Sequence, residues 1–211
     1  MSEALRIACL VSGGGRSVMN LQDRIESGRL PARIALVAAT RTGVPAIDRA
    51  RGRGLPAAEI ATEPRATLDD RLDHALQAAG AELVVLAGYL RLFRCRGWID
   101  RCINIHPALL PRHGGHGMWG HHVHQAVLAA GDRQSGCTVH WVDDRYDHGE
   151  PILRRNCPVL PSDTPDTLAA RVFAEELEAL PAAILEIAAW MRGGGPRPGT
   201  VMAAGTSTRT A

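Results

Sequence analysis

Two polar side chains, Asn104 and His106, lie at the end of a short strand-like segment, residues 102–105. Residues i and i+2 of a strand point to the same side, so we expect the amide and the imidazole to be neighbours. An amide N–H stabilises a developing oxyanion, and an imidazole moves protons near neutral pH. The pair therefore favours acyl transfer, although either residue alone is also common where a polar strand end caps a loop.

A third group with possible chemistry lies in the acidic segment 143–149 (DDRYDHG), between two further strand-like segments. Asp143 and Asp144 fit a solvated turn. Asp147 is also suited to orient a histidine across the site, or to share a proton with it. The residues alone do not decide between these two interpretations of Asp147.

A glycine-rich turn, Ser12 followed by glycines 13–15, separates the first apolar run from a segment with helical spacing. Glycine lets the backbone approach a ligand closely, and the N-terminus of a helix offers free N–H groups to an anion. This position favours a phosphate site over a turn without a ligand. The 24 basic residues are all arginines, which excludes a Walker-type loop and Schiff-base chemistry on a protein amine.

The elements that must position these groups alternate between strand and helix patterns, which predicts an α/β fold with a Rossmann-like, mainly parallel sheet flanked by helices. Two antiparallel strands are expected at its edge, and a flexible tail, 193–211, is expected after a domain that spans 1–192. The expected strands are 5–11, 33–39, 55–60, 82–87, 102–105, 137–142 and 152–159, and the expected helices are 16–25, 45–53, 67–79, 122–130 and 165–191.

Composition and charge narrow the class of protein. The chain is 45% hydrophobic and 22% charged, which is ordinary for a globular protein. Its net charge of +2 gives no strong field for a nucleic-acid partner, and no apolar run is long enough for a membrane span. The N-terminal residues lack a signal-peptide pattern, so we expect a cytoplasmic location.

The remaining candidate ligands are cysteines and histidines. The five cysteines are scattered without CxxC spacing, so we expect buried, reduced thiols and neither a disulfide framework nor a zinc site. A loop rich in histidine and glycine follows residue 112, but no HExxH motif or partnered cysteine accompanies it. No metal is therefore expected; the histidines of this loop are His113, His116, His121, His122 and His124.

Five sequence blocks, in order, resemble the folate-dependent formyltransferases, and most closely the phosphoribosylglycinamide formyltransferase family. The resemblance covers about residues 5–190. The blocks are SGGG (12–15), VVLAGYLRLF (84–93), NIHPALLP (104–111), SGCTVHWVDDRYDHG (135–149) and ARVFAEELEALP (170–181).

The resemblance implies roles for individual residues. By matching the family motifs, the catalytic group is Asn104, His106 and Asp147, with His140 close by. The implied site for the phosphorylated substrate comprises Gly13, Gly15, Arg16, Ser17, Arg65 and Glu176. The implied folate pocket comprises Arg91, Leu92, Phe93, Asp143, Asp144 and His148.

The implied reaction is transfer of the formyl group of 10-formyltetrahydrofolate, as co-substrate, to the amine of glycinamide ribonucleotide in purine synthesis. Arg16, His148, Glu150 and a longer loop at 113–120 depart from the family pattern around both ligand sites. Another acceptor amine therefore stays open, as does a non-catalytic nucleotide-binding domain of the same fold. The oligomeric state does not follow from the sequence.

Overall fold

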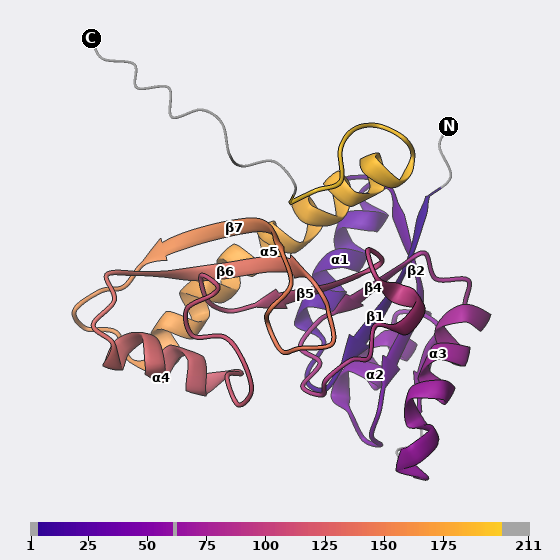
Figure 1. Ribbon diagram of the computed structural model, residues 1–211, viewed down its shortest axis with the longest axis horizontal. Coiled ribbons are helices and arrows are strands. Elements are labelled where there is room, and N and C mark those ends of the chain that lie inside the picture. Colours follow the sequence, from indigo (N-terminus) through magenta and orange to yellow (C-terminus); the bar gives the residue numbers. More distant parts are fainter. Residues whose placement is uncertain (1–3, 61–62, 200–211) are drawn as a thin grey trace.

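The computed structural model describes residues 4–60 and 63–199, which form helices around one seven-stranded sheet (Figure 1). Neighbouring strands from β3 to β5 are parallel, and β6 and β7 are antiparallel to their neighbours, which confirms the predicted fold class. In spatial order the strands are β3 (Ala57–Glu59), β2 (Ala32–Ala39), β1 (Leu5–Val11), β4 (Leu83–Leu86), β5 (Cys102–His106), β6 (Gln134–Trp141) and β7 (Pro151–Pro158).

Within the described residues, five α-helices cover the two faces of the sheet, and two short 3₁₀ helices lie in its connections. In β1, Ile7 and Cys9 face one core and Ala8 and Leu10 face the other, because successive strand residues point to opposite sides. The larger core includes residues of α1 (Arg16–Glu26), α2 (Pro45–Gly52), α4 (His121–Ala129) and α5 (Pro165–Met191). The smaller core includes residues of α3 (Leu68–Ala78) and η2 (Arg96–Trp98), and η1 spans Arg65–Thr67.

The expected elements are all present, with ends that differ by a few residues. The largest difference is in β6, which begins at Gln134 and not at Cys137. Its first residues pair with β7 through their backbone, and Gly136 lies opposite Asn156. Glycine contributes no apolar side chain, so hydrophobic patterning misses this part of the strand. All five cysteines are buried and free, as predicted.

The C-terminal residues 193–199 return to the sheet. The indole Nε1 of Trp141 donates to the carbonyl of Pro198 (2.8 Å), and the Arg197 guanidinium lies over the Trp141 ring, 4.6 Å from its centroid. Arg197 also pairs with Asp100 (2.8 Å) and with Glu150. The rest of the expected tail, 200–211, lies outside the described residues. Over the described part of the chain, no helix has the length and apolar character needed to cross a membrane.

Helix α5, which packs along β6 and β7 (Figure 1), begins at a dense polar cap. The hydroxyl of Thr164 accepts a hydrogen bond from the backbone N–H of Thr167. Beside it, both oxygens of the Asp163 carboxylate accept from the guanidinium of Arg171, at 2.6 and 2.9 Å. The hydrogen bonds from Arg171 and from the backbone N–H of Leu160 hold the pKa of Asp163 well below its ordinary value.

We expect Asp163→Asn to weaken the start of α5 in a pH-dependent way. A carboxylate whose pKa is lower in the folded than in the unfolded protein stabilises the fold when the pH is above its unfolded pKa of about 4. This contribution is lost as the pH falls through the folded pKa. The variant should have a lower urea midpoint than the wild type at neutral pH, and the difference should shrink on acidification. Equal midpoints at neutral pH would contradict the expectation. Asp48→Asn, at a carboxylate that is 80% exposed, is the matched control.

Candidate active site

The end of β5 and the facing part of β6 bring four polar side chains together. The antiparallel register places His140 directly opposite Asn104, and Thr138 opposite His106. The Thr138 hydroxyl donates to the carbonyl of Ala108 (2.7 Å) and accepts from the N–H of Leu110 (3.0 Å). It thereby braces the turn that follows β5.

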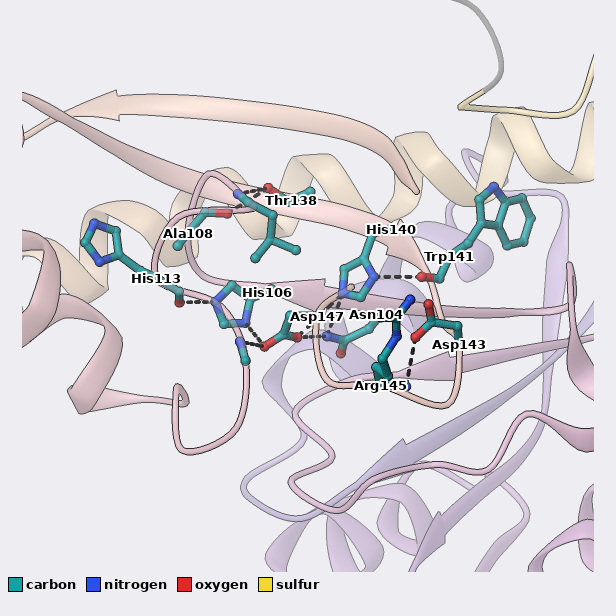
Figure 2. A network of polar contacts seen from close by, with 12 residues as sticks. Asn104, His106, Ala108, His113, Thr138, His140, Trp141, Asp143, Arg145 and Asp147 are labelled. Atoms are coloured by element: carbon teal, nitrogen blue, oxygen red, sulfur yellow. Dashed lines mark hydrogen bonds and ion pairs between the residues drawn. The ribbon is translucent and has the colours of Figure 1, made fainter. Parts of the chain in front are cut away.

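The proton position on His106 is determined by its surroundings. The ring is 3% exposed, and its Nε2 lies 2.8 Å from the carbonyl oxygen of His113. Because a carbonyl only accepts hydrogen bonds, Nε2 carries a proton. The other nitrogen, Nδ1, lies 3.3 Å from an oxygen of the Asp147 carboxylate. Figure 2 marks this contact with a dashed line.

The same reasoning assigns the protons of His140 and Asn104. The Nδ1 of His140 donates to the carbonyl of Trp141 (2.7 Å), so its Nε2 accepts from the amide nitrogen of Asn104 (3.1 Å). That amide nitrogen also donates to the Asp147 carboxylate (3.2 Å). Both amide hydrogens of Asn104 are engaged, so one of these bonds must be released before Asn104 can donate to a substrate.

Asp147 lies at the centre of this network (Figure 2) and has a left-handed backbone, with φ of 51°. Its side chain is 10% exposed, and one oxygen accepts from the backbone N–H of Gly115 at 2.9 Å. Burial raises the pKa of Asp147, but His140, His106 and the Gly115 N–H together outweigh burial, and the net pKa is lowered. The carboxylate is therefore ionised at neutral pH.

Burial is also the largest influence on the His106 imidazole, and here it lowers the pKa, against the opposing effect of the Asp147 carboxylate. Burial thus favours the neutral ring. The geometry, with an oxygen acceptor at each ring nitrogen, suits the charged ring. His106 is therefore placed to take up one proton during a reaction without moving.

These residues line one wall of a cavity of about 600 Å³, a size suited to small-molecule ligands. The glycine turn and α5 form one end, where Gly13, Gly15, Arg16, Ser17 and Glu176 line the wall. The segment after β4 forms the other end, where Arg91, Leu92 and Phe93 line the wall.

The end at the glycine turn is shaped by close packing. Gly15 has φ of 72°, and a Cβ placed there would approach the Cβ of Ala46 to 2.6 Å, so a larger residue is strained. The guanidinium of Arg16 lies 3.8 Å from the centroid of the Phe173 ring. Burial raises the pKa of Glu176 to about 7, while the charge of Arg16 opposes this shift. An arginine, an aromatic ring and a carboxyl that titrates near neutrality thus meet at this end.

Three residues predicted for the folate pocket do not line the cavity. Asp143 pairs with the His148 ring (2.6 Å) and accepts from the N–H of Arg145, and Asp144 accepts from the N–H of Cys95 (2.9 Å). These contacts brace the 143–148 loop and tie it to the segment after β4. Arg65 is part of η1, and its side chain lies outside the described part of the structure.

The histidine-rich loop takes part in the cavity wall, through His116, His121 and His124. Three of its rings have separate partners: His116 lies edge-on to Tyr146, His122 to Trp119, and His121 lies 3.6 Å from Asp166. Among the described residues, no group of three or more His, Cys, Asp or Glu side chains is arranged to hold a metal ion.

Several cavity residues were assigned no role from the sequence. Tyr89, Leu90, Trp119, Tyr146 and Phe173 line the wall because their loops and helix α5 converge in space. Leu90, Trp119 and Tyr146 are 45%, 47% and 36% exposed, so they form an apolar rim around the opening. An isolated aromatic residue in a loop does not differ in sequence from a surface residue, and only the tertiary contacts identify it.

Comparisons with known proteins agree with this geometry. A sequence model described as formyl transferase matches residues 5–184. The chloroplastic phosphoribosylglycinamide formyltransferase of Vigna unguiculata is 35% identical over 201 residues, covering 90% of this chain and 64% of that protein. The trifunctional purine biosynthetic protein adenosine-3 of Drosophila melanogaster is 36% identical over 187 residues, covering 85% of this chain and 14% of that protein.

A solved structure, glycinamide ribonucleotide transformylase 1 from Symbiobacterium toebii, superposes with a TM-score of 0.81 at 36% identity and covers 87% of each chain. The chain therefore spans less than two thirds of the length of the plant and insect relatives, but most of the bacterial one. The family match begins at the first residue of β1 and ends within α5, so it includes the strands and loops that form the cavity. The chain belongs to the formyl transferase family.

Proposed function

We propose that this protein transfers the formyl group of 10-formyltetrahydrofolate to the amine of glycinamide ribonucleotide, a step of purine synthesis. The observation that carries the proposal is the network of Asn104, His106, His140 and Asp147 at the middle of a cavity with two different ends. Such a cavity accommodates a phosphorylated amine at one end and a folate at the other. The proposed partners are small molecules, and a cytoplasmic location without nucleic-acid binding stays a prediction from the sequence.

The proposed chemistry is direct attack of the amine nitrogen on the formyl carbon. The carbonyl electron pair moves to oxygen, and the tetrahedral intermediate collapses by breaking the bond from carbon to N10 of the folate. One proton passes from the attacking amine to the leaving nitrogen. His106 takes part in this proton transfer and, when charged, stabilises the oxyanion together with the Asn104 amide. Asp147 keeps His106 oriented and compensates its positive charge.

We assign the end at the glycine turn to the ribonucleotide. Gly13, Gly15 and Ser17, at the start of α1, offer backbone N–H groups to the phosphate, and the chain has only arginines to add positive charge. Arg16 and Arg65 are the proposed arginines. Glu176, which faces the same end of the cavity, is the proposed acceptor for substrate hydroxyl groups.

We assign the opposite end to the folate. Arg91, Leu92 and Phe93 line it, and apolar walls with few polar groups suit a flat heterocycle. The loop with Asp143, Asp144 and His148 is the proposed border of this pocket. The hydrogen bond between Asp144 and the N–H of Cys95 connects the loop to the pocket wall, so folate binding and the position of Asp147 are expected to depend on each other.

A spectrophotometric assay with 10-formyltetrahydrofolate and glycinamide ribonucleotide tests the function. We expect turnover by the wild type, and a loss of about a hundredfold to a thousandfold in His106→Ala and in Asp147→Asn, because each variant removes transition-state stabilisation. His74→Ala, at an exposed histidine of α3, is the control. Binding of both ligands without formyl transfer would instead indicate a non-catalytic domain, and transfer to a different amine would change the acceptor.

The raised pKa of Glu176 predicts a pH effect on substrate binding. Below about pH 7 the carboxyl is protonated and accepts hydrogen bonds less well, so the KM for the ribonucleotide should fall as the pH rises through this value. Glu176→Gln should have a higher KM that lacks this step. Glu175→Gln, whose side chain pairs with Arg155, controls for titration of the substrate phosphate. An unchanged pH profile in Glu176→Gln would refute the role.

A further inference from the structure

We propose that Asp132 and His113 position the imidazole of His106, so that a part-buried hydrogen-bonded pair outside the cavity controls the proton on the catalytic ring. The proposal rests on the function proposed above for His106. It assigns a purpose to the first histidine of the histidine-rich loop, which the family pattern does not explain.

The hydrogen bond with Asp132 holds the side chain of His113. Its Nε2 lies 2.7 Å from one oxygen of the Asp132 carboxylate, and the two side chains are 15% and 13% exposed. The other oxygen of Asp132 pairs with the guanidinium of Arg112 at 2.7 Å. The hydrogen bond from His113, with the charge of Arg112, lowers the pKa of Asp132, so the carboxylate stays ionised. Asp132 lies just after α4, which is packed into the larger core.

The backbone of His113 provides the link to His106. His113 has φ of 55°, a left-handed conformation that few residues other than glycine adopt, although histidine and asparagine tolerate it better than most. In this conformation its carbonyl accepts the hydrogen bond from Nε2 of His106 at 2.8 Å (Figure 2). An unusual backbone conformation persists only where surrounding contacts hold it, and the pair with Asp132 supplies such a contact.

The same turn also holds the partner of His106. Two residues after His113, the N–H of Gly115 donates to the Asp147 carboxylate (2.9 Å). Between them, a Cβ at Gly114 would collide with the Leu110 side chain and approach the Cβ of Asp147 to 3.1 Å, so the turn packs closely on the catalytic loop. The turn 113–115 therefore keeps a proton on Nε2 of His106 and presents Nδ1 to Asp147.

Three variants separate this role from general stability. His113→Asn tolerates the left-handed backbone but is too short to keep the pair with Asp132. Asp132→Asn removes the charge that holds His113. In the double variant, the second substitution should add little to the effect of the first on His106, because both substitutions break the same contact between His113 and Asp132. His74→Asn repeats the substitution at an exposed histidine of α3. Urea unfolding of each variant shows which of them retain the fold.

The decisive measurement is ¹⁵N NMR of histidine-labelled protein without ligands, with the His106 signals assigned by comparison with His106→Asn. In the wild type we expect the Nε2–H form of His106 over the neutral pH range. In His113→Asn and Asp132→Asn we expect a mixture of the two neutral forms and a shifted His106 pKa. A His106 spectrum and titration that stay unchanged in both variants would overturn the proposal.

Kinetics provide the second readout. We expect kcat to fall about tenfold in each single variant, as is typical when a residue that orients a catalytic group is lost. The KM values of both substrates should change by less than about twofold, because the binding contacts are intact. A rise in KM at unchanged kcat would contradict a positioning role. If the wild type itself lacked formyl transfer, the proposed function would fail, whereas the NMR result would still decide the positioning of His106.

Discussion

The candidate active site depends on one largely buried carboxylate, Asp147, which lies between two imidazoles and must be kept ionised. A charge in this position is unfavourable unless hydrogen bonds compensate for the lost water. The Asn104 amide and the Gly115 N–H supply those bonds, and His106 supplies a group that can become positive. The left-handed backbone of Asp147 brings the carboxylate to this point. The conformation of the loop therefore places the charge within reach of the groups that stabilise it.

The sheet provides the fixed frame for this arrangement. Asn104 and His106 are on β5, where the sheet changes from parallel to antiparallel, and the register with β6 places His140 opposite Asn104. The antiparallel β6 also leads directly into the loop that carries Asp147. Because residues 103–106 of β5 pair with residues 138–141 of β6, the spacing of Asn104, His106 and His140 is set by backbone geometry.

Segments from distant parts of the chain complete the cavity, and side chains of one segment contact those of another. Arg16 from α1 lies over Phe173 and near Glu176 of α5, so the charge state of the carboxyl depends on the contact between two helices. Asp144 ties the loop that carries Asp147 to the segment after β4. The cavity wall is therefore held by contacts between segments that are distant in the sequence.

The sequence by itself determined the alternation of strands and helices, the neighbouring positions of Asn104 and His106, and the family resemblance. Hydrophobic period and the side-chain alternation of a strand are local properties, so they can be read without the fold. The family resemblance implied a place for Asp147 beside His106, and the tertiary structure shows the contact between them. The tertiary structure alone decided that Asp143 and Asp144 brace their loop, and that His113 lies against His106. These outcomes depend on which loops meet across the sheet, and the contacts that bring loops together are absent from any local pattern.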